Sequence, residues 1–136
     1  MKVLAVLITF YSFVFPVAAQ LAIKVSPPKL SSRKAIVPLC ISNGLNQTVE
    51  SARAGGFLLD ENGKILGQAT HWIIGDGKNK VAMPPGATNV FNFVITTDKP
   101  FATTNPTPRI TVTRVALEGG KLADAKNEVQ IVPVDK

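Results

Sequence analysis

The strongest constraint on the fold is a stretch near the middle of the chain, residues 55–68, in which two apolar segments flank Asp60-Glu61-Asn62-Gly63. An Asn-Gly pair readily adopts positive φ at both central positions of a tight turn, and such a turn matches the twist of paired strands. We therefore predict a β-hairpin with strands over residues 48–60 and 64–74. The Gly55-Gly56 pair in its first strand predicts a bulge or a close backbone approach.

Five further segments have the alternation or the β-branched content that is typical of strands. They cover residues 21–26, 35–43, 88–97, 109–117 and 129–134. Residues 30–34 are predicted as a polar crossing loop, the Pro-rich residues 98–108 as the longest connection, and residues 122–128 as strand, loop or helical turn. We expect Pro38 at a bulge or where no ladder hydrogen bond is needed. Seven short strands without a convincing amphipathic helix predict an all-β sandwich.

Alternation along these strands assigns one set of side chains to a core between two sheets. Aromatic residues two positions apart on one strand suit such a core, because they fill it from the same face. We predict that the core contains Val37, Leu39, Ile41, Phe57, Leu59, Ile65, Trp72, Ile74, Phe91, Phe93, Ile95, Val112 and Ile131.

The first residues have the pattern of a cleavable signal peptide. Lys2 precedes an apolar run over residues 3–17, and Val17-Ala18-Ala19 offers small residues for cleavage after Ala19. The run is shorter than the roughly 20 apolar residues that a membrane span needs. We therefore expect a signal peptide over residues 1–19, one domain over residues 20–136, a periplasmic or extracellular location and no membrane span after cleavage.

The net charge of +6 is spread along the chain and indicates a solvated surface more than a binding block. A nucleic acid partner is not expected, because the chain is exported and lacks aromatic residues interleaved with Arg or Lys. Asn46-Gln47-Thr48 fits the N-glycosylation sequon, which matters only in a eukaryotic secretory route.

Cys40 is the only cysteine, so no disulfide can form within the chain. Alternation points its side chain away from the face shared by Val37, Leu39 and Ile41. Two interpretations stay open, a small shielded hydrophobic residue, which we favour, and a free thiol that pairs between chains.

The sequence offers little chemistry for catalysis. His71 is the only histidine, and no Gly-x-Ser-x-Gly segment supplies a nucleophile for it. A dyad with Cys40 would need two separate strands to meet. No spacing of His, Cys and carboxylates is typical of a metal site, and Asp76-x-x-Asn79 lacks the oxygen ligands of a calcium loop. We therefore predict a non-enzymatic protein with no catalytic residues, cofactor or metal.

His71-Trp72 is the most distinctive pair, and its two side chains must point to opposite faces of a strand. We predict that Trp72 faces the core and His71 faces solvent, given the apolar area that tryptophan buries. If the register is shifted by one residue, Trp72 is exposed and forms a binding surface that can stack on a sugar or grip a partner.

Three motifs occur in a recognisable order: Leu39-Cys40-Ile41-Ser42-Asn43, the hairpin from Gly56 to Ile65, and Pro85-Gly86 followed by Phe91-Asn92-Phe93. This order, over about residues 36–117, resembles small immunoglobulin-like domains of bacterial secreted proteins, and most closely the FxLYD-type domains. Gly56 stands at the first Phe position of the name-giving motif, and Leu59 at its Tyr position. The resemblance implies an immunoglobulin-like antiparallel β-sandwich of about seven strands, an envelope location and no catalytic residues.

The predicted function is an exported, non-enzymatic domain that binds a protein or an envelope component. Edge strands and loops are the usual binding sites of a sandwich, and we expect the loop 75–80 and the connection 98–108 to form the surface. The candidate binding residues are His71, Trp72, Asp76, Lys78, Lys80 and Phe101. One alternative is a carbohydrate-binding module that uses Trp72, and a second is a small enzyme or redox protein that uses His71 or Cys40.

Overall fold

The computed structural model describes residues 19–75, 81–102 and 105–134 of the chain. Its elements are, in chain order, β1 (Leu21–Val25), β2 (Lys29–Ser31), β3 (Lys34–Asn43), β4 (Val49–Leu59), β5 (Ile65–Ile74), β6 (Thr88–Thr96), β7 (Thr107–Leu117), a short 3-10 helix (Glu118–Gly120) and β8 (Val129–Val132). The all-β prediction is confirmed. The loop predicted over residues 30–34 is partly wrong, because residues 29–31 pair with residues 34–36 around a turn at Ser32, whose φ is 51°.

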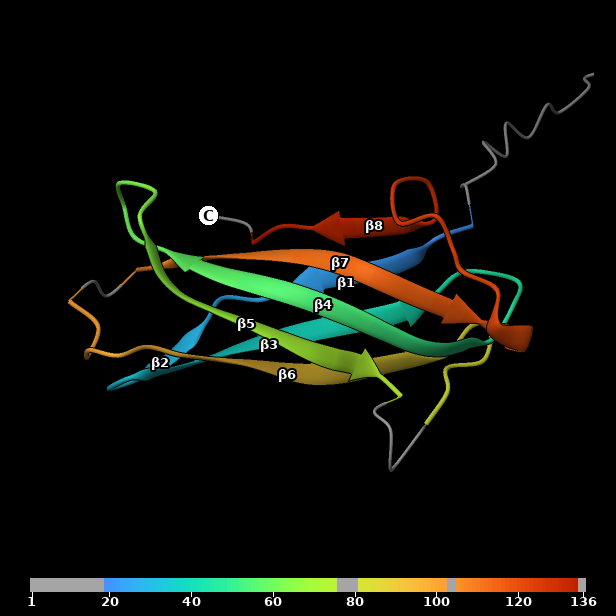
Figure 1. The fold of residues 1–136 in the computed structure, drawn as a ribbon, viewed down its shortest axis with the longest axis horizontal. Helices are drawn as coiled ribbons and strands as arrows, with labels where there is room; N and C mark the ends of the chain where they lie inside the picture. Colours follow the sequence, from blue (N-terminus) through green and yellow to red (C-terminus); the bar gives the residue numbers. More distant parts are fainter. Residues whose placement is uncertain (1–18, 76–80, 103–104, 135–136) are drawn as a thin grey trace, which may run out of the picture.

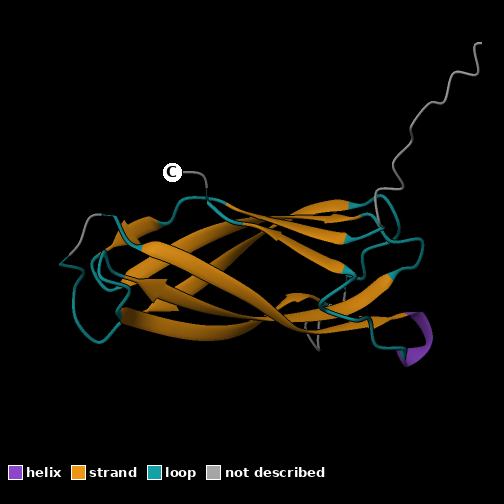
Figure 2. Ribbon diagram, turned by 90° about the horizontal axis from the view of Figure 1, so that it is seen from above, coloured by secondary structure: helices purple, strands orange, loops and turns teal. Residues whose placement is uncertain are grey.

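The strands form two sheets that pack face to face as a β-sandwich (Figures 1 and 2). The larger sheet has the order β6-β3-β1-β8, with β2 also paired to β3, and the smaller sheet has the order β5-β4-β7. One pair departs from an antiparallel arrangement, since β8 runs parallel to β1 from Leu21↔Val129 to Lys24↔Val132. After β7 the chain forms one antiparallel bridge back onto that strand, Ala116↔Leu122, and then crosses to the larger sheet, where β8 pairs with β1.

The predicted hairpin is formed by β4 and β5, but its turn differs from the predicted one. The Asp60 carboxylate accepts hydrogen bonds from the backbone amides of Asn62 (2.9 Å) and Lys64 (2.8 Å). Gly63 has a φ of 80°, whereas Asn62 does not adopt positive φ. The Asp60 side chain satisfies the amides of a longer loop, so the left-handed conformation is needed only at Gly63.

Pro38 lies within β3, the strand at the centre of the larger sheet. Its carbonyl accepts a hydrogen bond from the Ser26 amide at 2.9 Å. The amide and carbonyl of one residue point to the same side of a strand, so the missing Pro38 donor faces the break between β1 and β2 at Pro27-Pro28. The prediction that Pro38 needs no ladder bond is consistent with this placement.

The core lies between the two sheets, and about half of the predicted core residues are buried in it. Val37, Leu39, Ile41, Ile74, Phe93, Ile95 and Val112 are buried, whereas Phe57, Leu59, Phe91 and Ile131 are only partly buried. The prediction is wrong for Ile65 and Trp72, whose side chains are 54% and 39% exposed.

The error on β4 has a packing cause. The inward residues of this strand are Ala52, Ala54, Gly56 and Leu58, so Phe57 and Leu59 point outward. Three of these four inward residues are small. At Gly56 the reason is that the Phe93 ring of the opposite sheet fills the space in front of the strand. Of the two predictions for the Gly55-Gly56 pair, the close approach is confirmed, since the Phe93 ring lies against the backbone at Gly56. The bulges of β4 lie at other positions.

Asn43 is the one fully buried polar residue among the described side chains. Its amide group donates to the carbonyls of Gln47 (3.0 Å) and Met83 (2.9 Å), and its side-chain oxygen accepts from the Leu45 amide (3.0 Å). Asn43 thus joins the loop after β3 to the segment that precedes β6.

The predicted signal peptide falls almost wholly on residues 1–18, which lie outside the described residues. In the part of the chain that the structure does describe, no helix has the length and apolar character needed to cross a membrane.

Candidate functional site

The structure reverses the predicted orientations of His71 and Trp72. The His71 ring lies between the sheets, with its centroid 4.7 Å from that of Phe93 in a T-shaped contact. Its Nε2 atom lies 2.7 Å from the Val94 carbonyl oxygen, and because a carbonyl can only accept, Nε2 carries a proton and donates it. Trp72, the next residue, points outward from the smaller sheet.

A β-bulge explains why the prediction failed. Arg53 pairs with Trp72 and Ala52 pairs with Ile74, so Ile73 is an extra residue on β5. Ile73 and Ile74 are both buried, each 3% exposed. Trp72 therefore does not share the face of the buried Ile74, although the two residues are two positions apart.

The outward side of the smaller sheet gathers residues from three strands, and we call it the Trp72 face. Direct cross-strand pairs place Trp72, Arg53 and Arg114 in one row, Thr70, Gly55 and Thr111 in a second, and Gln68, Phe57 and Arg109 in a third. Directly opposite residues share a face, so these nine positions form one continuous surface over β5, β4 and β7.

The middle of the Trp72 face is hollow because Gly55 has no side chain. A Cβ atom built at Gly55 would meet nothing within 4 Å. An open depression of about 350 Å³ lies here, lined by Gly55, Gly56, Phe57, Gln68, Ala69 and Thr70. The Gly-Gly pair therefore has two roles, since Gly56 admits a core ring on one side and Gly55 leaves a hollow on the other.

The Trp72 face is positively charged. The three strands carry Arg53, Arg109 and Arg114 and a single carboxylate, Glu50, near the start of β4. The Arg53 guanidinium lies over the Trp72 ring, 5.7 Å from its centroid, which is a cation–π geometry. Arg53 and Arg114 are direct cross-strand neighbours in the backbone register, so two positively charged residues stand side by side on this surface.

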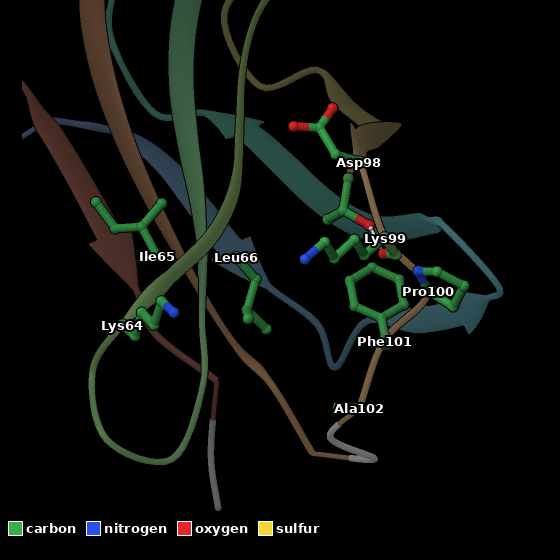
Figure 3. A pocket seen from close by; sticks show the side chains of 9 residues that line it. Lys64, Ile65, Leu66, Asp98, Lys99, Pro100, Phe101 and Ala102 are labelled. Carbon is green, nitrogen blue, oxygen red and sulfur yellow. Dashed lines mark hydrogen bonds between the residues drawn. The ribbon is translucent and has the colours of Figure 1, made fainter.

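Phe101 lies at the other end of the smaller sheet. It lines a cavity of about 340 Å³ together with residues 64–66, 97–100 and 102. Figure 3 shows the Leu66 side chain pointing toward the Phe101 ring from the start of β5. Trp72 is six residues beyond Leu66 along β5, or about 20 Å at the usual rise of a strand.

The described parts of the predicted surface, Gly75 and the residues around Phe101, lie at opposite ends of β5. Gly75 follows the end of β5, whereas residues 97–102 lie beside its start. Asp76, Lys78 and Lys80 lie outside the described residues.

Cys40 and His71 are not brought together. Cys40 pairs with Lys24 and Val90 on the outward side of the larger sheet, and its thiol is free and partly buried. His71 lies on the inward side, against Phe93. Among the described residues, no group of three or more His, Cys, Asp or Glu side chains could hold a metal ion.

No protein-family model matches the chain, and no curated protein is significantly similar to it. The resemblance to FxLYD-type domains stays a prediction, and the geometry of the Trp72 face carries the functional argument.

Sequence reasoning identified Trp72 but missed Arg53, Gly55, Arg109 and Arg114. One signal in the sequence could have shown which side of β4 faces outward. Small residues at 52, 54 and 56 alternate with Arg53, Gly55 and Phe57. Small residues can face the core when large aromatic side chains of the opposite sheet fill the space in front of them, so Arg53 and Phe57 would then face outward.

Proposed function

We propose that this chain is an exported, non-enzymatic binding domain with an immunoglobulin-like β-sandwich, and that it holds an envelope component on the Trp72 face. The observation that carries the proposal is the exposed Trp72 ring with Arg53 over it, beside the depression at Gly55. Trp and Arg are the residue types that most often dominate binding energy, and a hollow gives a ligand a place to seat.

The exposure of Trp72 is costly without a partner. An indole has a large apolar area that would gain free energy by leaving water. The cation–π contact with Arg53 covers part of the ring and holds the guanidinium in place, so less side-chain entropy is lost when a ligand binds. The same exposure supports the carbohydrate-binding form of this function, because an aromatic ring can stack on the apolar face of a sugar.

A non-enzymatic role is supported by what His71 already does. Its Nε2 proton is engaged by the Val94 carbonyl, and its ring packs against Phe93 inside the sandwich. These contacts give the histidine a structural role at the edge where β5 approaches β6.

The proposal is tested by co-sedimentation of the purified mature chain with insoluble envelope material from the producing organism. The wild-type chain is expected in the pellet, and Trp72→Ala is expected to stay in the supernatant. Lys24→Ala, an exposed change on the outward side of the larger sheet, is the matched control and should behave as wild type. Equal sedimentation of all three chains, or none by the wild type, would reject binding through this face.

A further inference from the structure

We propose that the ligand of the Trp72 face is a polysaccharide that carries carboxylate groups. This inference rests on the proposed function and adds the chemical class of the ligand. The first observation is the charge of this surface. The strands of the smaller sheet carry three arginines and one peripheral carboxylate, so the outward side is strongly cationic and complementary to an anionic ligand.

The arginines are placed at both ends of the hollow. Arg53 and Arg114 form the row beside Trp72, and Arg109 lies in the row of Phe57. Phe57 is four positions after Arg53 along β4, so these rows are about 13 Å apart at the usual rise of a strand. A chain laid along β4 would therefore meet a cation at each end and the depression at Gly55 between them.

The Arg53–Arg114 pair points specifically to an anion. Like charges directly opposite one another destabilise a sheet, and no carboxylate lies in the same row. A guanidinium can bind a carboxylate through two parallel hydrogen bonds. One carboxylate between the two arginines would relieve their repulsion and gain charge-assisted hydrogen bonds.

The middle row favours a sugar over an acidic peptide. Thr70 lines the hollow at Gly55, and Thr111 is the cross-strand partner of Gly55 on the other side, so hydroxyl groups lie on both sides of a position that has no side chain. These groups can exchange hydrogen bonds with ring hydroxyls, and Trp72 offers an aromatic surface beside them. An acidic peptide would use the arginines but would leave the hollow and the ring unfilled.

The test uses oligogalacturonate of defined length as the probe. Its fully methyl-esterified form has the same sugar backbone without charge, and poly-glutamate represents an acidic peptide. Trp72 is the only tryptophan, so its fluorescence reports on this face directly. We expect oligogalacturonate to bind, with an affinity that falls as salt is added, and the methyl ester and poly-glutamate to bind at least about tenfold more weakly, as lost charge-assisted contacts would require.

Variants locate the site on the sheet. Arg53→Gln, Arg109→Gln and Arg114→Gln are each expected to weaken oligogalacturonate binding about tenfold, the usual effect of losing a hydrogen bond to a charged group. Lys24→Gln is the matched control on the other sheet and should bind as wild type. Thermal melting confirms that each variant is folded.

Two results would overturn the inference: equal binding of the methyl ester or of poly-glutamate, or arginine variants that bind oligogalacturonate as wild type does. Sedimentation with envelope material that depends on Trp72, without oligogalacturonate binding, would reject the ligand class and leave the proposed function standing.

Discussion

The Phe93 ring lies directly against Gly56, so close that a Cβ atom at Gly56 would be 2.5 Å from Cε1 and 2.9 Å from Cζ. Phe93 is fully buried, and Ile110 closes the same space from β7. The contact joins the two sheets at their centre. It also requires a residue without a side chain at position 56, on the inward face of β4.

Gly56→Ala should lower the free energy of unfolding by about 1–3 kcal/mol, the usual cost of inserting a methyl group into a packed core. Gly55→Ala is the matched control, because the same change one residue earlier meets open space. It should be neutral or stabilise by about 0.5 kcal/mol, since glycine weakens a strand interior. Chemical denaturation of both variants checks the prediction, and equal effects at the two positions would contradict the packing.

Asn43 should be the most sensitive polar position of the described chain. Asn43→Ala leaves the Met83 carbonyl and the Leu45 amide without their side-chain partners in a buried site. A buried group left without any partner costs about 1–3 kcal/mol, and the Met83 carbonyl keeps its hydrogen bond from the Val49 amide, so we expect a loss of about 1–3 kcal/mol. Asn92→Ala, an exposed change on β6, serves as the control and should cost less than about 0.5 kcal/mol. An Asn43 variant with a wild-type melting curve would refute the assignment.

The positions of seven of the eight strands were predictable because proline and glycine separate them and the alternation within them is local, whereas the three-residue strand β2 is too short to show alternation. The orientations of Trp72 and Phe57 were not, since a bulge at Ile73 and the apolar run Phe57-Leu58-Leu59 both hide the period of two. Face assignment in such segments depends on what the opposite sheet supplies, here the ring of Phe93.

The charge of the Trp72 face was hidden for a different reason. Arg53 and Arg114 are far apart in the sequence and become neighbours only through the register of β4 and β7. That register contains a bulge between Arg53 and Ala54, and a single sequence does not specify which residues will pair across it. The sequence shows basic residues spread along the chain. The pairing of β4 with β7 places three of them, Arg53, Arg109 and Arg114, on one surface.

Glu118 should make stability depend on pH in the acidic range. Hydrogen bonds from the Thr48 side chain and then from the Thr48 amide lower the pKa of the Glu118 carboxyl below its ordinary value of 4.5. A carboxyl with a depressed folded pKa stabilises the fold above its unfolded pKa, and this contribution is lost as pH falls through the folded pKa.

The melting temperature of wild type should therefore exceed that of Glu118→Gln at neutral pH, and the difference should shrink below about pH 4.5. The effect is small because Glu118 is fully exposed. Glu61→Gln, at the hairpin turn, provides a comparison with another exposed glutamate. A difference for Glu118→Gln that stays constant from neutral to acidic pH would contradict the role of the Thr48 contacts.

The Arg53–Arg114 pair predicts that stability and binding respond in opposite directions to one substitution. Arg114→Gln removes a like-charge neighbour and should raise the free energy of unfolding by about 0.2–1 kcal/mol in the absence of ligand. The gain should decrease at high salt, because exposed charges are screened there. The same variant should bind oligogalacturonate more weakly, since one of the two guanidinium groups is lost.

Denaturation at two salt concentrations separates the effect on stability from the effect on binding. Arg109→Gln is the control, because Arg109 pairs with Phe57 and not with a cation. If Arg114→Gln and Arg109→Gln destabilise the free protein equally, Arg53 and Arg114 do not repel one another. An anion between these two arginines would then have no repulsion to relieve.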